Sequence, residues 1–283
     1  MTADLHIHTY YSDGLNSPTE VVNLAVNNRL TAIALTDHDS VAGIDEALEI
    51  ANNHGLIVIP GIEISTVNEG QDIHILGYYI DYKNPKLLEK LHDLRSAKIN
   101  RNLRIINRLN QLGIEITIDE VNSKAMAANV RIGRPHIAQV LVEKKYVKNI
   151  REAFIRFLGE QGQAYIVTES ISPEAGIDLV KEAGGASVLA HPGIYNDDAL
   201  LFRLIEYGLD GIEVYHPDHN VQTINTLRKI AKAHSLIITG GSDYHGLRDY
   251  TPFHAALGSY NVPLANLKLL EELTNTRKKD LIR

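Results

Sequence analysis

The sequence predicts an α/β fold in which mainly parallel strands alternate with helices around a helical insertion. Apolar strand-like stretches alternate with helical patterns before residue 85 and again after residue 162. Six of these stretches are followed by histidine or carboxylate side chains, the usual ligands of zinc, manganese and iron. A parallel α/β barrel gathers such strand ends into one site. The pattern therefore indicates a metalloenzyme.

The composition fits one large domain with an insertion as well as it fits two domains. Of the 283 residues 44% are hydrophobic, and none is cysteine, which excludes disulfides. The apolar runs are too short to span a bilayer, and no leader pattern precedes Asp4, so we expect a cytoplasmic protein without a membrane partner. The net charge of −7 does not attract duplex nucleic acid. A cationic pocket in such a surface suits a small anion, and nothing indicates an obligatory protein partner.

Strands and helices are expected to alternate in the first part of the chain. Leu5–His8 has period two, which places His6 and His8 on the same side of a strand. Pro18 suits the first position of a helix. The further elements expected are a strand at Thr31–Thr36, a helix at Val41–Asn53, a strand from Leu56 through Gly61 to Ser65, and an antiparallel neighbour at Ile73–Ile80.

The middle of the chain is expected to be a helical insertion over one mouth of the barrel. Lys86–Leu112 has a long, arginine-rich helical pattern, and shorter helices follow without strand alternation. The expected domains are a barrel of residues 1–84 and 163–283 and an insertion of residues 85–162. In the second barrel segment we expect strands at Ala186–Ala190, Gly211–Tyr215 and Leu236–Thr239, with helices beginning near Pro173, Asp197 and Asp218.

Polar side chains at the strand ends are the strongest functional signal. An apolar strand has no packing reason to end in Thr36-Asp37-His38-Asp39, and Ser242-Asp243-Tyr244-His245 repeats this pattern later in the chain. Glu63 lies between two isoleucines, and a buried carboxylate there needs a partner such as a metal ion.

These runs resemble the polymerase-and-histidinol-phosphatase (PHP) family of metal-dependent phosphoesterases. The resemblance implies a distorted (β/α)7 barrel with a three-metal cluster at the C-terminal ends of its strands. Glu63 and His74 match two further ligand positions of the family. The four motifs that match are Asp4-Leu5-His6-Ile7-His8, Thr36-Asp37-His38, Ala190-His191-Pro192 and Ser242-Asp243-Tyr244-His245.

The resemblance also implies a ligand set, and we expect two to three divalent ions per chain. A ligand set of imidazoles and carboxylates without thiolate does not discriminate among manganese, iron and zinc. The resemblance to the family implies manganese as the first expectation, with iron or zinc as alternatives. One metal would take His6, His8, Glu63 and Asp243, a second would share Glu63 and add His74 and His191, and a third would take Asp13, His38 and His245.

Two further runs, Gly133-Arg134-Pro135-His136 and Tyr215-His216-Pro217-Asp218-His219, resemble one branch of the family. That branch removes the 3′-phosphate of nucleoside 3′,5′-bisphosphates and trims short RNA from the 5′ end, by metal-activated hydroxide. Arg134 would clamp a non-reacting phosphate, and His216 would assist the clamp or protonate the leaving oxygen. The expected substrate contacts are Asp13, Arg134, His136, His216 and His219. Ordinary structural roles at a helix start and a strand end are the alternatives for Arg134 and His216.

Three other functions remain open. A monoester phosphatase for histidinol phosphate or another small metabolite would use the same cluster without needing Arg134. An exonuclease acting on oligonucleotides could guide a strand along the basic segment Arg95–Arg108, although such a segment is more often a solvated helix face. A non-catalytic barrel could retain metals for stability, but the complete ligand set argues against this.

Overall fold

The computed structural model describes residues 2–127, 133–159, 161–167, 170–248, 251–252 and 254–281, which fall into two compact units. Unit 1 comprises Met1–Glu89 and Ile171–Arg283, and unit 2 comprises Lys90–Ser170. Each unit has apolar cores of its own. No helix in the described part of the chain is long and apolar enough to cross a membrane.

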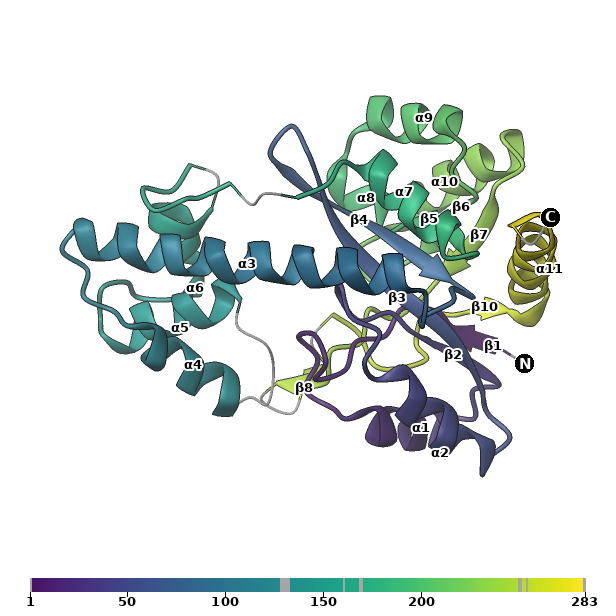
Figure 1. Cartoon of the computed structure of the whole chain (residues 1–283), viewed down its shortest axis with the longest axis horizontal. Helices are drawn as coiled ribbons and strands as arrows, with labels where there is room; N and C mark the ends of the chain where they lie inside the picture. Colours follow the sequence, from purple (N-terminus) through teal and green to yellow (C-terminus); the bar gives the residue numbers. More distant parts are fainter. Residues whose placement is uncertain are drawn as a thin grey trace. The chain divides into compact units, whose positions relative to one another are not determined.

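Unit 1 is built on an eight-stranded sheet in the order β10-β1-β2-β3-β4-β5-β6-β7 (Figure 1). Its neighbouring strands are parallel except in the pairs β1–β10, β3–β4 and β4–β5. The strands are β1 (Thr2–Asp4), β2 (Ala32–Leu35), β3 (Ile57–Asn68), β4 (Gln71–Tyr78), β5 (Ala186–Leu189), β6 (Gly211–Tyr215), β7 (Ile237–Gly240) and β10 (Val262–Pro263), with a separate hairpin of β8 (Leu247–Arg248) and β9 (Thr251–Pro252).

The sheet nearly closes, because the segments that follow β1 and β7 meet. The backbone N–H of Leu5 donates to the carbonyl of Gly240 at 3.2 Å, and Ile7 pairs with Tyr244 in parallel. This arrangement confirms the predicted α/β barrel. The expected antiparallel pairing of β3 with β4 is also confirmed.

Helices cover the outside of the sheet, and local sequence signals explain where they begin. Ser17 Oγ accepts from the Glu20 N–H at 3.1 Å while Glu20 accepts from the Ser17 N–H at 2.7 Å, which caps α1 at Pro18 as predicted. The helices of unit 1 are α1 (Pro18–Asn27), α2 (Ile44–Asn52), α7 (Pro173–Glu182), α8 (Pro192–Tyr195), α9 (Asp198–Tyr207), α10 (Val221–Ala233) and α11 (Leu264–Leu281).

Apolar side chains fill two regions of unit 1. One core lies inside the sheet and includes Leu5, Leu76 and Tyr78, all without solvent exposure. The other packs β2 and β3 against α1 and α2 and includes Val21, Val22 and Ala47. Both cores lie behind the strand ends, so they hold those ends in fixed positions.

Several predicted bounds differ from the structure; for example, α2 begins at Ile44 and not at Val41. β1 ends at Asp4 and not at His8, because the N–H of Ile7 donates to the Thr36 side chain at 3.0 Å and the N–H of His8 donates to Tyr244 O at 2.9 Å. α10 begins at Val221 and not near Asp218, since Asn220 provides its N-cap. β1 therefore ends where hydrogen bonds to the segments of Thr36 and Tyr244 begin, and a side-chain hydrogen bond of Asn220 sets the start of α10.

Unit 2 is helical among its described residues. Its core includes Ile105, Leu109, Ile137, Leu141 and Leu158, all buried. Helix α3 begins in unit 1 and continues through the start of unit 2. The elements are α3 (Pro85–Gln111), α4 (Ile118–Ala127), α5 (Arg134–Glu143), α6 (Ile150–Ala153) and a π-helical turn η1 (Phe154–Leu158).

Candidate active site

All nine residues expected to bind metal come together in unit 1. They lie beyond the ends of β1, β2, β5 and β7, within β3 and β4, and in the loop before α1. All except His191 belong to groups of at least three residues whose ligand atoms lie within 4.8 Å of one another. The residues are His6, His8, Asp13, His38, Glu63, His74, His191, Asp243 and His245.

The first group is buried and contains two imidazoles and two carboxylates. His6 Nε2 lies 3.3 Å from both Glu63 Oε2 and Asp243 Oδ1. His8 Nε2 lies 3.2 Å and 3.1 Å from the same two oxygens. Two nitrogens and two oxygens match the ligand number of a tetrahedral metal site.

The second oxygen of Glu63 belongs to another group. Glu63 Oε1 lies 2.9 Å from His74 Nδ1 and 3.2 Å from His191 Nε2. Glu63 pairs with Leu76 across the antiparallel strands, so Glu63 and His74 are diagonal neighbours on one face of the sheet. Glu63 therefore lies between the two groups, in the position of a bridging ligand.

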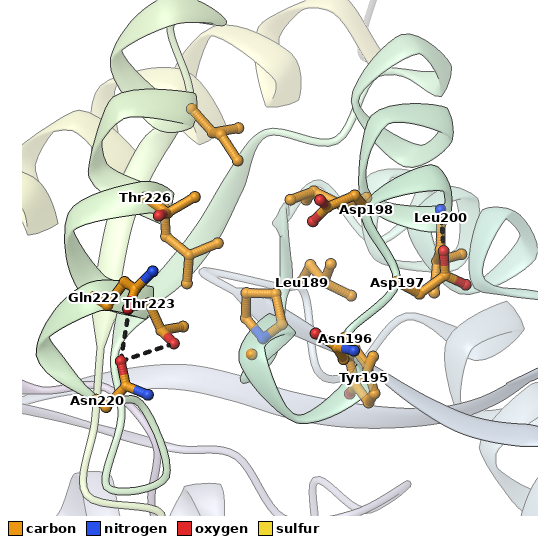
Figure 2. Close-up of a pocket in the computed structure, with 15 residues that line it drawn as sticks. Leu189, Tyr195, Asn196, Asp197, Asp198, Leu200, Asn220, Gln222, Thr223 and Thr226 are labelled. Carbon is orange, nitrogen blue, oxygen red and sulfur yellow. Dashed lines mark hydrogen bonds between the residues drawn. The ribbon is translucent and has the colours of Figure 1, made fainter.

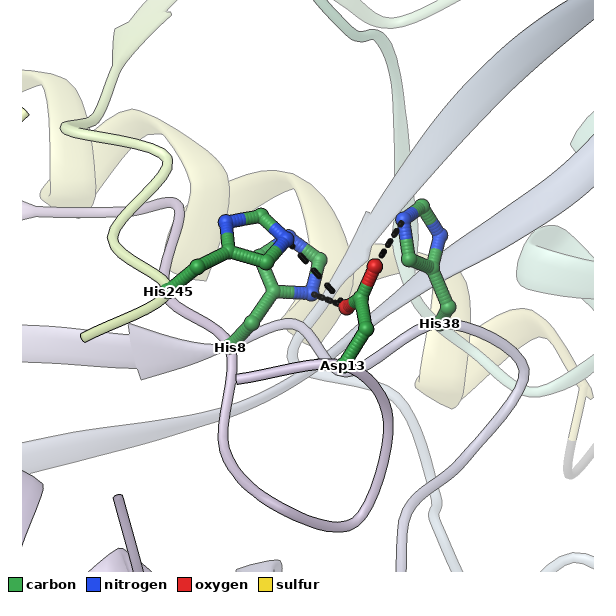
Figure 3. A group of neighbouring side chains, drawn as sticks. All are labelled: His8, Asp13, His38 and His245. Carbon is green, nitrogen blue, oxygen red and sulfur yellow. Dashed lines mark ion pairs between the residues drawn. The ribbon is translucent and has the colours of Figure 1, made fainter. Parts of the chain in front are cut away.

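The third group gathers around the carboxylate of Asp13 (Figure 3). Asp13 Oδ1 lies 3.2 Å from His245 Nε2 and 3.6 Å from His8 Nδ1, and Asp13 Oδ2 lies 4.0 Å from His38 Nε2. The three residues expected to share a metal are thus together. Asp13 and His38 are partly exposed, so this group is the most open to solvent of the three.

Hydrogen bonds behind the histidines determine which ring nitrogen faces the cluster. His6 Nδ1 lies 3.0 Å from Glu213 Oε1, and His245 Nδ1 lies 2.8 Å from the carbonyl oxygen of Asp243. These oxygens can only accept, so each Nδ1 carries a proton and each Nε2 is the atom available to a metal.

His8 is oriented by a short relay of hydrogen bonds. Its Nδ1 lies 3.3 Å from Ser12 Oγ, and Ser12 Oγ donates to Asp37 Oδ1 at 2.6 Å. Thr9 also donates to Asp37, through its N–H and its hydroxyl, both at 2.7 Å. Asp37 is therefore a supporting residue of the site and holds the loop that carries Asp13.

The unpartnered atoms of the cluster fit a metal. The Nε2 atoms of His6 and His8 are fully buried and have no hydrogen-bond partner among the described residues, whereas buried polar atoms are nearly always satisfied. Carboxylate oxygens at 3.1–3.3 Å from these nitrogens require a proton or a cation between them. Imidazole and carboxylate without thiolate suit divalent manganese, iron or zinc.

In the metal-free cluster, neighbouring charges strongly shift the pKa values of Glu63 and His8. Burial raises the pKa of Glu63, but His38, His74 and His6 together hold it well below its ordinary value. Burial lowers the pKa of His8, but the carboxylates of Asp243 and Glu63, at 3.1 and 3.2 Å from its Nε2, raise it to about 10. Without metal, the carboxylate is therefore ionised and His8 is protonated near neutral pH, so a metal ion must displace a proton.

Two residues of the cluster have left-handed backbone conformations. φ is 31° at His191 and 50° at Asp243. Such conformations in residues other than glycine cost free energy and concentrate at functional sites. Each lies directly after the turn that leaves a barrel strand, where the strained backbone aims the side chain at the cluster.

His216 also faces the cluster but presents a proton. The N–H of Asp218 donates to His216 Nδ1 at 3.2 Å, so in the neutral ring the proton is on Nε2. His216 Nε2 lies 3.4 Å from Asp243 Oδ2, and the ring is fully buried. His216 is therefore placed as a hydrogen-bond donor and not as a metal ligand.

His219 has a structural role in this unit. Its Nδ1 donates to Val214 O at 2.9 Å, and its Nε2 accepts from the Gly193 N–H at 3.0 Å. Both ring nitrogens are used and the ring is buried; the expected contact of His219 with substrate stays a prediction.

Arg134 and His136 lie in the first turn of α5, in unit 2. The guanidinium of Arg134 lies 6.0 Å from the ring centroid of Phe154. His136 Nδ1 accepts from the Gly133 N–H at 2.9 Å, so its Nε2 carries the proton. Since each unit is described by itself, contact of these residues with a substrate at the cluster stays a prediction.

Sequence reasoning assigned no role to three side chains of the site. Glu213 lies between Ile212 and Val214 in an apolar strand, the same signal that identified Glu63. Asp4 accepts from the N–H of Ser242 at 3.0 Å and from its hydroxyl at 2.6 Å, which holds the loop of Asp243. His254, whose Nε2 lies 3.6 Å from Asp243 Oδ2, follows no recognisable pattern.

A cavity of about 360 Å³ lies between α8, α9 and α10 (Figure 2). Leu189, Leu201 and Ile230 contribute apolar side chains to its lining, and Asp197 and Asp198 contribute carboxylates. None of its described lining residues is lysine, arginine or histidine, so it does not suit a phosphate.

Comparison with known proteins identifies the family of the chain. The family model of the PHP domain matches residues 4–183. A 5′-3′ exoribonuclease of Haemophilus influenzae is 35% identical over 86% of this chain and 89% of its own length. A 3′,5′-nucleoside bisphosphate phosphatase of Chromobacterium violaceum is 32% identical over 86% of each chain.

Two further similarities bear on the chemistry and the fold. A phosphoribosyl 1,2-cyclic phosphate 1,2-diphosphodiesterase of Eggerthella lenta is 30% identical over 87% of this chain and 95% of its own length. The crystal structure of a protein described as a metal-dependent phosphoesterase from Bifidobacterium adolescentis matches with a TM-score of 0.83 and 34% identity over 96% of each chain. The relatives share hydrolysis of phosphate esters and differ in the substrates that their names give.

Proposed function

Because the chain belongs to the PHP family of metal-dependent phosphoesterases and is a hydrolase of phosphoric esters, we propose that it removes the 3′-phosphate from nucleoside 3′,5′-bisphosphates. The hydrolytic part of this proposal is supported by one observation: the imidazole nitrogens of several histidines surround the carboxylate of Glu63. The substrate follows from the similarity to a phosphatase of that name and from the arginine and histidine at the start of α5.

We propose that the cluster holds two to three divalent ions, manganese first and iron or zinc as alternatives. His6, His8, Glu63 and Asp243 would hold one ion, Glu63, His74 and His191 a second, and Asp13, His38 and His245 a third. Bound metal ions supply Lewis-acid chemistry, which lowers the pKa of a nearby water and offsets negative charge on phosphoryl oxygens.

In this proposal the protein's own residues position the ester and donate one proton to the leaving oxygen. His216 Nε2–H lies at the cluster and can donate to the leaving oxygen, while the Asp218 N–H keeps Nδ1 as an acceptor. In this proposal Arg134 binds the non-reacting 5′-phosphate through its planar fork of donors, and His136 Nε2–H adds a second donor. Asp13 lies at the open side of the cluster, where it can contact the substrate.

The test is a comparison of substrates and of Arg134 variants. A charge-assisted hydrogen bond contributes roughly 1.5–3 kcal/mol, or about one to two orders of magnitude in kcat/KM. Arg134→Ala should lower kcat/KM for a 3′,5′-bisphosphonucleoside by that factor and change hydrolysis of a simple monophosphate much less. Arg134→Lys should recover part of the loss, because the planar fork is missing.

Arg156 offers a matched control in the same unit. It is an arginine that pairs with Glu152 at 2.9 Å and lies 4.8 Å from the Phe157 ring centroid, so Arg156→Ala removes a similar side chain outside the proposed phosphate contact. Equal losses on both substrates in Arg134→Ala would assign Arg134 to the fold or the metal centre. If Arg134→Ala lost no kcat/KM on either substrate, a monoesterase of the histidinol-phosphate type would become the better hypothesis than a bisphosphate phosphatase.

A second candidate is 5′-3′ trimming of short RNA, which the similarity to the Haemophilus influenzae exoribonuclease favours. Helix α3 carries the basic residues that could follow a single strand: Arg95, Lys98, Arg101, Arg104 and Arg108. The substrate panel should therefore include a short 5′-phosphorylated RNA, a phosphoribosyl 1,2-cyclic phosphate and histidinol phosphate. Faster turnover of the RNA than of the bisphosphonucleoside at equal concentration would reverse the order of the two candidates.

A further inference from the structure

Glu213 is a fully buried carboxylate that touches two parts of the cluster without facing its centre. It lies in β6, between the apolar side chains of Ile212 and Val214. Its oxygens lie 3.0 and 3.2 Å from His6 Nδ1, and Glu213 Oε2 accepts from the backbone N–H of His191 at 2.9 Å. One side chain therefore contacts a residue after β1 and another after β5.

The contact with His6 controls the ring and its tautomer. Both oxygens of Glu213 lie within hydrogen-bonding distance of His6 Nδ1, and one of them also accepts from the His191 N–H. A carboxylate acceptor at Nδ1 keeps the ring proton there and directs the Nε2 lone pair of His6 toward Glu63 and Asp243.

The contact with His191 controls the backbone. His191 has φ 31° and ψ 54°, a left-handed conformation that a histidine adopts only when its surroundings impose it. The hydrogen bond from its N–H to Glu213 supports this turn. On the other side, Tyr195 packs against the His191 ring at 5.4 Å between ring centroids and accepts from the His74 N–H at 2.9 Å.

We propose that Glu213 is a positioning residue that holds two metal positions of the centre at once, one through the His6 ring and one through the His191 backbone. The inference rests on the proposed metal centre. It goes beyond the ligand set, because it makes the occupancy of two positions depend on one side chain that binds no metal itself.

Glu213→Gln separates this role from simple packing. Glutamine has nearly the same shape, but its single carbonyl oxygen can accept from His6 or from the His191 N–H and not fully from both. Its amide N–H₂ would face the remaining donor. Ser12→Ala is the control, because His8 is the one proposed metal ligand whose hydrogen-bond partner it removes among the described residues, although it also removes the donor to Asp37.

The measurements are metal content after dialysis against graded chelator and thermal unfolding with and without Mn²⁺. Loss of an outer partner of a metal-binding histidine typically weakens metal affinity by about 10–100-fold. We expect Glu213→Gln to lose two ions per chain at chelator concentrations where Ser12→Ala loses one. The rise in Tm that Mn²⁺ produces should shrink, while the Tm of the metal-free protein stays close to that of the wild type.

Several outcomes would overturn the assignment. An unchanged Mn²⁺-induced rise in Tm, or the same loss of Tm with and without Mn²⁺, would make Glu213 a residue of the fold alone. Glu213→Asp, which keeps both oxygens on a shorter stem, should retain more metal than Glu213→Gln; the reverse order would also contradict the proposal. A wild-type chain that neither binds nor is stabilised by Mn²⁺, Fe²⁺ or Zn²⁺ would overturn the metal centre itself, whereas a failed phosphatase assay with normal metal binding would leave the role of Glu213 in place.

Discussion

Substitution of Glu63 by glutamine tests whether one carboxylate is shared by two metal positions. Its Oε2 faces His6, His8 and His38 at 3.1–3.3 Å. Its Oε1 faces His74 and His191 at 2.9 and 3.2 Å. The substitution removes the negative charge and replaces one acceptor by a donor, while it keeps the volume of the side chain.

The magnitude follows from the number of positions that lose a charged ligand. If each loses an interaction of roughly 1.5–3 kcal/mol, the total is about 3–6 kcal/mol, or about two to four orders of magnitude in metal affinity. His245 contributes one neutral imidazole to the group around Asp13, so His245→Ala should cost about half as much free energy by the same reasoning.

The assay is elemental analysis of both variants after dialysis against a series of chelator concentrations, with far-UV circular dichroism to confirm folding. We expect Glu63→Gln to keep about one metal ion per chain under conditions where His245→Ala keeps about two, because the first substitution affects two of the three proposed positions and the second affects one. The reasoning is refuted if His245→Ala loses as much metal as Glu63→Gln, because Glu63 then serves one position only.

Three further predictions concern protons and packing. The pKa of His8 in the metal-free protein is raised from 6.5 to about 10, so its protonated form stabilises that protein at low pH and is lost as the pH rises through about 10. Between pH 6.5 and about pH 10, metal affinity should therefore rise about tenfold per pH unit for each proton that the metal displaces. Titration of metal into unbuffered protein should detect the released proton. A metal affinity that does not depend on pH would contradict this prediction. Asp4→Ala leaves the donors of Ser242 and Gly258 without their acceptor, and should cost about 3 kcal/mol or more in the urea-induced unfolding of metal-free protein, an expectation that fails if the loss is below about 1 kcal/mol. Gly193→Ala would place a Cβ 2.6 Å from the His219 ring and should cost about 1–3 kcal/mol in the same assay; no loss would remove the structural role assigned to His219.

Part of the ligand set has a local signal in the sequence, and the resemblance to the PHP family implied the rest, including Asp13 and His74. Glu63 stands out as a carboxylate in an apolar strand, and Ser242–His245 stands out as a polar run after one. The C-terminal ends of barrel strands lie on one face of the barrel, so residues at these ends are expected to lie close together. For the same reason the barrel itself was predictable from the alternation of strands and helices.

The supporting residues were harder to predict because their partners are distant in sequence. Glu213 has the same local pattern as Glu63, but its contact with His6 spans 207 positions and could not be read from either segment. His219 belongs to a run that resembles a substrate-binding motif, yet the backbone of Gly193 and Val214 uses both of its ring nitrogens. The roles of Arg134 and His136 depend on how α5 lies relative to the barrel, which no pattern within the segment determines.

The closure of the barrel between the segments after β1 and β7 has a consequence for the order of folding. Asp4 bonds to Ser242 and Gly258, which are 238 and 254 positions away, and His6 faces Asp243. Contacts of such long range form late, because closing a long loop loses chain entropy before the contact can stabilise the fold. A nascent chain can present His6, His8 and Glu63 long before Asp243 has been synthesised. Full metal affinity should therefore arise only when the C-terminal segment joins β1, and metal uptake would report the completion of the fold.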